Sequence, residues 1–115
     1  MQIDEIGEAI ARSPWFEGLP DKAIGRLAGA ATVETFEVDS RLYTQGEPST
    51  RIYGVISGRV RLSLTSAHGH EFALVDREGG TWLGEPGLVD DQARIIDGRV
   101  IERATVLVIP RDLVL

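Results

Sequence analysis

The sequence contains no cysteine, and its only two histidines are His68 and His70. The lack of cysteine excludes disulfide bonds, thiolate metal sites, iron–sulfur clusters and cysteine nucleophiles. Two histidines in one short loop are too few for a multi-histidine metal centre, and we interpret them as exposed loop residues. We therefore expect a protein without a metal ion or another cofactor.

Long hydrophobic runs and an excess of positive charge are also missing. No apolar stretch approaches the roughly 18 residues needed to span a bilayer, and no secretion signal follows Met1. These features predict a cytoplasmic protein with no membrane partner. The net charge of −6 has the wrong sign for a nucleic-acid-binding surface, so any contact with DNA must come from residues outside this chain.

The 115 residues that are present, 43% of them hydrophobic, predict one domain with a substantial core. We divide it into a helical lead-in over residues 1–31, a β-rich body over 32–110, and the start of a helix over 111–115. That last helix has no stop signal, and we expect the chain to be truncated within it.

The lead-in predicts two helices. Ile3, Ile6 and Ile10 recur at helical spacing before Ser13-Pro14, which ends the first helix. Pro20 and Asp21 then favour a new helix start. Its apolar face consists of Ile24, Leu27, Ala28 and Ala31. Trp15 and Phe16, in the connection, are predicted core anchors.

From about residue 32 the hydrophobic period changes to two, which is typical of half-buried strands. Val60, Leu62 and Leu64 alternate with polar residues. Strands are predicted over 33–38, 42–44, 51–57, 59–65, 72–74, 99–102 and 105–109. We expect a tight turn at Ser57-Gly58 and a hairpin loop over 66–69. Many short strands at regular spacing predict an antiparallel β jelly roll. Its core is expected to include Val60, Leu62, Leu64, Phe72, Leu74, Trp82, Val106 and Val108.

Residues 80–94 break the alternating pattern. Gly84 and Gly87 flank Glu85 and Pro86, and proline suits the first position of a helix. We therefore expect a short helix near residues 86–90. Its first backbone N–H groups, at Gly87 and the two residues after it, would form an anion site that a glycine lets a ligand approach closely.

Arg94 lies close enough in sequence to supply a neutralising, bidentate charge at that anion site. A phosphate would repel Glu85, so the partner of Glu85 is a hydroxyl or Arg94 itself. Together these residues suit a sugar phosphate. The alternative is an ordinary surface turn in which Glu85 and Arg94 form an ion pair that contributes little to stability.

Several motifs carry a resemblance to a known family. They are residues 13–20 (SPWFEGLP), 42–48 (LYTQGEP), 53–61 (YGVISGRVR), 79–85 (GGTWLGE) and 106–110 (VLVIP). With this glycine spacing the chain resembles, over nearly its whole length, the cyclic-nucleotide-binding effector domain of the Crp/Fnr family of bacterial transcription regulators.

The resemblance implies a ligand, cyclic AMP or a related nucleotide, and a role for each site residue. Glu85 would bind the ribose 2′-hydroxyl, and Arg94 the cyclic phosphate. The N–H groups of Gly87 and Ile95 would also reach the phosphate, and Leu62 and Leu74, on facing strands, would lie against the base. The implied ligand-binding set is Gly84, Glu85, Gly87, Arg94, Ile95, Leu62 and Leu74.

The chain departs from the family pattern at several of these positions. Pro86 follows the glutamate, Ile95 and Ile96 replace small residues after Arg94, and Asp97 brings a second carboxylate near the phosphate. Arg77, near the base pocket, replaces what is often an apolar residue. These departures favour a second hypothesis, a ligand-free domain that serves dimerisation or protein contact.

The resemblance also implies a homodimeric full-length protein whose dimerisation helix and DNA-binding helix-turn-helix lie outside this chain. Ligand binding would then change DNA affinity by linkage. We do not expect an enzyme. A metal-dependent jelly-roll enzyme would need several converging histidines, and a Glu85–Asp97 acid–base pair would lack a nucleophile.

Overall fold

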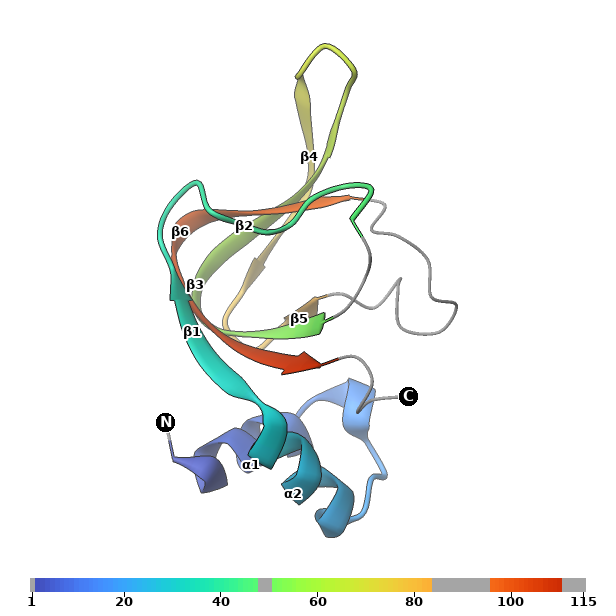
Figure 1. Ribbon diagram of the computed structural model, residues 1–115, viewed down its shortest axis with the longest axis vertical. Coiled ribbons are helices and arrows are strands. Elements are labelled where there is room, and N and C mark those ends of the chain that lie inside the picture. The colour runs from blue at the N-terminus through green and yellow to red at the C-terminus, as the bar shows by residue number, and fades with distance from the viewer. Residues whose placement is uncertain (1, 48–50, 84–95, 111–115) are drawn as a thin grey trace.

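The computed structural model describes residues 2–47, 51–83 and 96–110, apart from the Trp15 side chain. A strongly curved antiparallel sheet stands above a pair of helices (Figure 1). The helical elements are α1 (Ile3–Ala11), the 3₁₀ turn η1 (Pro14–Phe16) and α2 (Asp21–Ala30). The strands are β1 (Thr32–Phe36), β2 (Arg41–Tyr43), β3 (Arg51–Thr65), β4 (Glu71–Glu78), β5 (Trp82–Leu83) and β6 (Asp97–Pro110). In the described part of the chain, no helix has the length and apolar character to cross a membrane.

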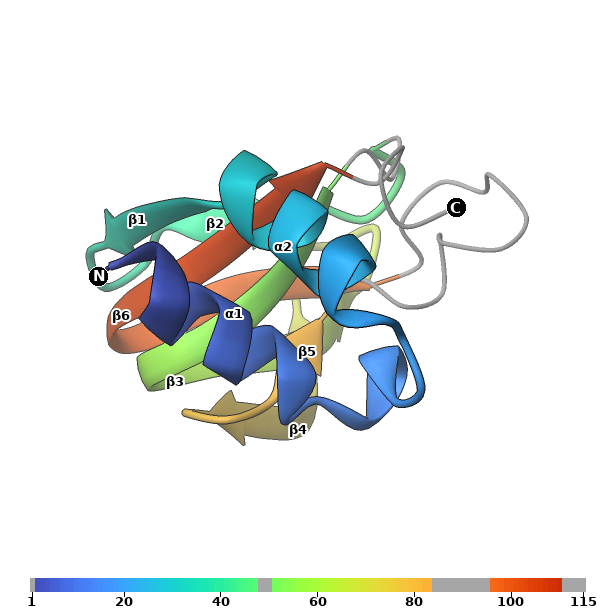
Figure 2. The same ribbon diagram turned by 90° about the horizontal axis from the view of Figure 1, so that it is seen from below.

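Both predicted helices are confirmed. The Glu5 carboxylate accepts a hydrogen bond from the Gln2 N–H at 3.2 Å and so satisfies a free donor at the start of α1. Ile6 and Ile10 on α1 and Leu27 on α2 are buried, as their spacing predicts. Together with Phe16 they cover one end of the sheet, where they pack on Ile52, Leu107 and Ile109 (Figure 2).

The sheet confirms the predicted mainly-β, antiparallel jelly-roll class. Its strand order is β1-β6-β3-β4, with β2 added to β6 and β5 added to β3. The long strands β3 and β6 form its spine, paired from Arg51 opposite Pro110 to Ser63 opposite Asp97. All strand pairs are antiparallel.

The predicted turn at Ser57-Gly58 is wrong, because β3 continues through it as one strand. Gly58 has φ of 86°, and the β3–β6 register shifts on both sides of Ser57. A Cβ at Gly58 would lie 2.2 Å from the carbonyl oxygen of Arg103. Gly58 therefore serves a bulge, which bends a strand without ending its pairing. The opposite strands predicted over 99–102 and 105–109 are likewise one strand, β6.

The core prediction is correct for the barrel interior and wrong for the β3–β4 hairpin. Val60, Leu62, Val106 and Val108 are at most 8% exposed, and Trp82 is partly buried between barrel and helices. Three predicted core residues are instead exposed: Leu64 at 40%, Phe72 at 59% and Leu74 at 54%.

The hairpin residues are exposed because of where the hairpin stands. Leu64 and Phe72 lie opposite each other in the register, so they share one face, as the alternation predicts. However, β4 pairs only with β3, and the hairpin projects beyond the rest of the sheet (Figure 1). No other described element covers that face. The hairpin loop over 66–69 is confirmed by the Ser66 N–H, which donates to the His70 carbonyl at 2.9 Å, and both histidines are exposed.

Candidate functional site

Most of the predicted ligand site falls in one segment, residues 84–95, between β5 and β6. Gly84, Glu85, Gly87, Arg94 and Ile95 lie outside the described residues, as do the short helix expected near residues 86–90 and the helix start at 111–115. Their roles remain predictions. The structure does describe how the chain enters and leaves this segment, and both ends are held on β3.

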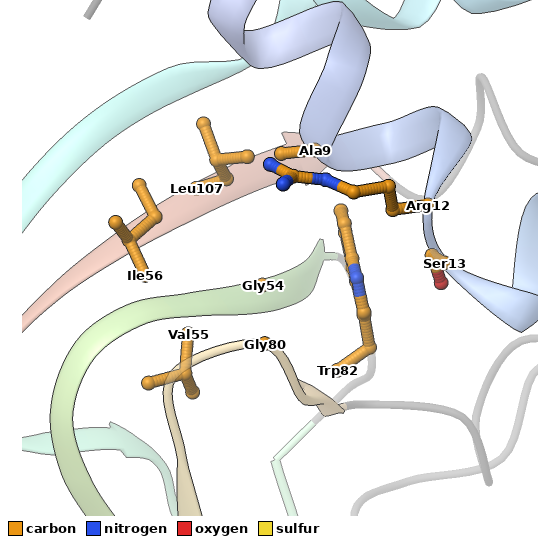
Figure 3. Close-up of a pocket in the computed structure, with 9 residues that line it drawn as sticks. All are labelled: Ala9, Arg12, Ser13, Gly54, Val55, Ile56, Gly80, Trp82 and Leu107. Atoms are coloured by element: carbon orange, nitrogen blue, oxygen red, sulfur yellow. The ribbon is translucent and has the colours of Figure 1, made fainter.

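The entry to the segment is held by aromatic packing. On β5, Leu83 and Trp82 pair with Tyr53 and Gly54 of β3, and Leu83 is buried. The Trp82 ring packs edge-on against Phe16, with the ring centroids 5.2 Å apart and the planes at 81°. A Cβ on Gly54 would lie 3.0 Å from the Trp82 ring, so glycine allows the ring to lie close against β3. The helical lead-in is thereby joined to β5, and Figure 3 shows Trp82 between β3 and the end of α1.

The exit from the segment is held by a buried carboxylate, Asp97, which is 1% exposed. One carboxylate oxygen accepts the Gln45 N–H at 2.7 Å, and the other accepts the Thr65 hydroxyl at 2.5 Å. The guanidinium of Arg41 lies 3.2 Å from the second oxygen. Asp97 thus ties the first residue of β6 to the turn after β2 and to the end of β3.

These contacts keep Asp97 ionised. Burial by itself would raise the pKa of the carboxyl group, but the Gln45 N–H, the Thr65 hydroxyl and the charge of Arg41 outweigh that effect. The pKa of Asp97 consequently lies below its ordinary value. The sequence alone presented Asp97 as a second carboxylate close to a phosphate, whereas the structure gives both its oxygens other partners.

A polar hollow of about 380 Å³ lies beside Asp97. Its lining residues are Arg41, Thr44, Gln45, Gly46, Thr65 and Asp97. The neighbouring Ile96 packs against the barrel core. The large apolar side chain of Ile96, which departs from the family pattern, is therefore explained by its packing on the barrel core.

The two predicted base contacts lie on paired strands, as expected, but in different surroundings. Leu62 is 8% exposed and belongs to the barrel core, whereas Leu74 is 54% exposed. The register shifts after Leu62, so that Leu74 is an extra residue between the partners of Leu62 and Ser63. Of these two leucines, Leu62 alone forms part of the barrel's interior wall. Arg77, further along β4, is exposed.

Ion pairs join the two strands of the hairpin to each other and to β6, a feature that sequence analysis missed. Arg61 binds Asp76 through two hydrogen bonds of 2.8 and 3.1 Å. Arg99 binds Glu71 in the same bidentate way at 2.8 and 3.0 Å and also reaches Asp39 at 3.0 Å. The guanidinium hydrogen bonds lower the pKa of Asp76 and of Glu71. In the described part of the chain, no three potential metal-ligating side chains gather at one point.

Comparison with known proteins assigns the chain to a family. The family model described as "Cyclic nucleotide-binding domain" matches residues 33–115. The chain belongs to this family. The match spans the entry strand, the segment 84–95 and the exit strand, so the motif-based resemblance is confirmed.

One curated relative and two solved structures from bacteria are similar to this chain. It is 27% identical over 107 residues to a CRP-like cAMP-activated global transcriptional regulator of Mycobacterium tuberculosis, covering 93% of this chain and 48% of that protein. The chain thus spans about half the length of this relative.

The fold is shared with the sensor domain of the transcriptional regulator DNR from Pseudomonas aeruginosa, with a TM-score of 0.89 at 16% identity, covering 97% of this chain and 75% of that one. It is also similar to the N-terminal domain of a transcriptional regulator from Streptomyces coelicolor. There the TM-score is 0.78 at 27% identity, over 91% of this chain and 75% of that one.

Proposed function

We propose that this domain senses cyclic AMP or a related cyclic nucleotide for a Crp/Fnr-type transcription regulator and controls DNA binding by a domain outside this chain. The observation that carries the proposal is the placement of the segment 84–95. Its two ends are fixed on the same strand of a cyclic nucleotide-binding fold, and it contains Glu85 and Arg94, to which the family resemblance assigns the ribose and the phosphate.

In the proposed complex each group has a distinct task. Glu85 accepts the ribose 2′-hydroxyl, and Arg94 binds the cyclic phosphate together with the N–H groups of Gly87 and Ile95. The base lies against Leu62, with Leu74 on the facing strand. Support comes from the buried position of Leu62 and from Asp97, which holds the chain three residues after Arg94.

Allosteric control follows from the two anchors of the segment. A bound nucleotide would restrain the segment between β5 and β6, and β5 packs on the helical lead-in through Trp82 and Phe16. A ligand can shift an equilibrium only by its difference in affinity for the two states. We propose that the nucleotide-bound state is the one with altered DNA affinity.

The proposal includes a cytoplasmic homodimer with no enzymatic activity of this domain. The relation to a bacterial transcription regulator supports this setting. The apolar residues on the β3–β4 hairpin, exposed by 40–59%, offer surface for a subunit contact.

Calorimetric titration with cyclic AMP and cyclic GMP tests the ligand. We expect saturable binding by the native chain and an at least tenfold loss in Arg94→Ala, because a charge-assisted contact to phosphate contributes about 1.5–3 kcal/mol. Arg26→Ala, which removes an exposed helix cation, serves as the control and should bind like the native chain.

No binding of either nucleotide at millimolar concentration would overturn the proposal and leave the ligand-free hypothesis. In that case Ile95→Ser combined with Asp97→Thr would show whether those two departures close the site. Equal binding by Arg94→Ala and Arg26→Ala would show that Arg94 does not contact the ligand.

A further inference from the structure

A second hollow lies between the helical lead-in and the sheet, outside the segment 84–95 (Figure 3). Its volume is about 380 Å³, within the range of pockets that hold small molecules. It is lined by Ala9, Arg12, Ser13, Gly54, Val55, Ile56, Gly80, Trp82 and Leu107. Residues of α1, β3, β5 and β6 thus meet around one space.

The walls of this hollow are mainly apolar. The side chains of Ile56, Trp82 and Leu107 form these walls, whereas the Val55 side chain points away from them into the barrel core (Figure 3). The backbone polar groups at the base are already paired, since the Gly80 N–H donates to the Val55 carbonyl at 2.7 Å. A ligand here would therefore need an apolar body, and Trp82 offers an aromatic surface beside it.

One cation lies at the rim. Arg12, the C-cap of α1, extends above Trp82 toward Ala9 and Leu107 (Figure 3). It forms no ion pair with any acidic side chain of the described residues. Its position also suits the negative end of the α1 dipole, which alone could account for an arginine there.

The charge around this hollow distinguishes it from two other hollows of similar size. Although the chain has 18 acidic residues, none lines the hollow at Arg12. The hollow between α1 and α2 has Asp4, Glu8 and Asp21 in its lining, and the one beside Asp97 contains that carboxylate. Of these three, only the hollow at Arg12 combines a cation without an ion pair and a lining without acids.

We propose that this hollow binds a small organic carboxylate with an aromatic or other compact apolar body. The apolar body would lie between Trp82 and Ile56, and the carboxylate would pair with the Arg12 guanidinium, whose planar fork matches it. A single cation beside apolar walls suits a singly charged carboxylate better than a phosphate, which carries more charge to desolvate. The site uses no residue of the segment 84–95 and is independent of the nucleotide proposal.

The test titrates the chain with phenylacetate, 3-phenylpropanoate and 4-phenylbutanoate, and with the corresponding neutral amides, by calorimetry. We expect saturable, one-to-one binding of at least one acid, about tenfold tighter than its amide. Arg12→Gln should remove that preference, whereas the matched control Arg26→Gln should keep it. Ala9→Leu, which adds bulk at the mouth on a helix position, should weaken acid and amide alike.

Circular dichroism and thermal unfolding of each variant would establish that it is folded. Three results would overturn the proposal. They are the absence of saturable binding by all three acids at millimolar concentration, equal affinity for acids and amides, and identical behaviour of Arg12→Gln and Arg26→Gln. The last result would leave Arg12 with its role at the end of α1.

Discussion

The two ends of the segment 84–95 are held by opposite kinds of chemistry. At the entry, Trp82 and Leu83 are fixed by apolar and aromatic contacts to Phe16 and to β3. At the exit, Asp97 is fixed by hydrogen bonds and a charge. Aromatic packing contains no group that titrates, whereas a buried carboxylate holds only while it is ionised. The same segment therefore has one anchor that a fall in pH weakens and one that it does not.

Breaking the entry anchor should have the largest effect. Phe16 is 4% exposed and packs edge-on against Trp82, so Phe16→Ala leaves a cavity between the helical lead-in and the barrel. We expect a loss of about 3–5 kcal/mol in the free energy of unfolding, measured by urea denaturation. The loss should be the same at pH 7 and pH 5. A loss below about 1 kcal/mol would show that the lead-in contributes little to stability.

Breaking the exit anchor should cost less. Asp97→Asn keeps the shape of the side chain but removes its charge, and an amide cannot accept from Gln45, Thr65 and Arg41 equally well. Because hydrogen bonds to a charged group contribute about 1.5–3 kcal/mol, we expect a loss of about 2 kcal/mol at pH 7 by urea denaturation. Asp76→Asn is the matched control, since it removes the same charge from a pair that is about a third exposed. It should cost clearly less than Asp97→Asn, because solvent-exposed ion pairs contribute little to stability.

How far the sequence predicts these anchors depends on how local their causes are. The helices and the strand around Leu62 can be predicted because residues close in sequence show a hydrophobic period of 3.6 or 2. Gly58 misleads because a tight turn and a bulge both use a glycine at positive φ. The exposure of Phe72 could not be predicted from the sequence. Alternation shows which residues lie on the same face of a strand, but it does not show whether another element covers that face.

No pattern among neighbouring residues predicted the contacts of Asp97, the exit anchor. Gln45 and Thr65 lie 52 and 32 residues from Asp97, and only the folded sheet brings them together. By contrast, the glycine and glutamate motif at residues 84–85 lies in one continuous run, so the sequence can propose a ligand segment there, and this segment stays a prediction. The entry contact is intermediate, because Phe16 and Trp82 were both expected core residues but the contact between their rings was not predicted.

The pH dependence sharpens the comparison of the two anchors. The pKa of Asp97 is lowered in the folded state, so its contribution is fully present above the unfolded pKa of about 3.9 and is lost as the pH falls below it. The difference in unfolding free energy between the native chain and Asp97→Asn should therefore be constant from pH 7 to 5 and decrease below about pH 4. Glu71 and Asp76, whose pKa values are also lowered, will still destabilise Asp97→Asn in acid. A difference that stays constant down to pH 3 would contradict the assignment of Asp97 as an ionised anchor.

The smallest loss of stability is expected at the β3–β4 hairpin. There Phe72 serves as a matched residue for Phe16 of the entry anchor. Phe72 is the same residue type as Phe16 but is 59% exposed, so Phe72→Ala removes little buried surface. Since exposed substitutions usually change stability by less than about 0.5 kcal/mol, we expect urea denaturation to show almost no loss, against several kcal/mol for Phe16→Ala. A loss above about 2 kcal/mol would mean that the hairpin face is covered in solution by part of the chain or by a second copy. Measuring both variants at two protein concentrations separates these causes, because only contact with a second copy makes the loss depend on concentration.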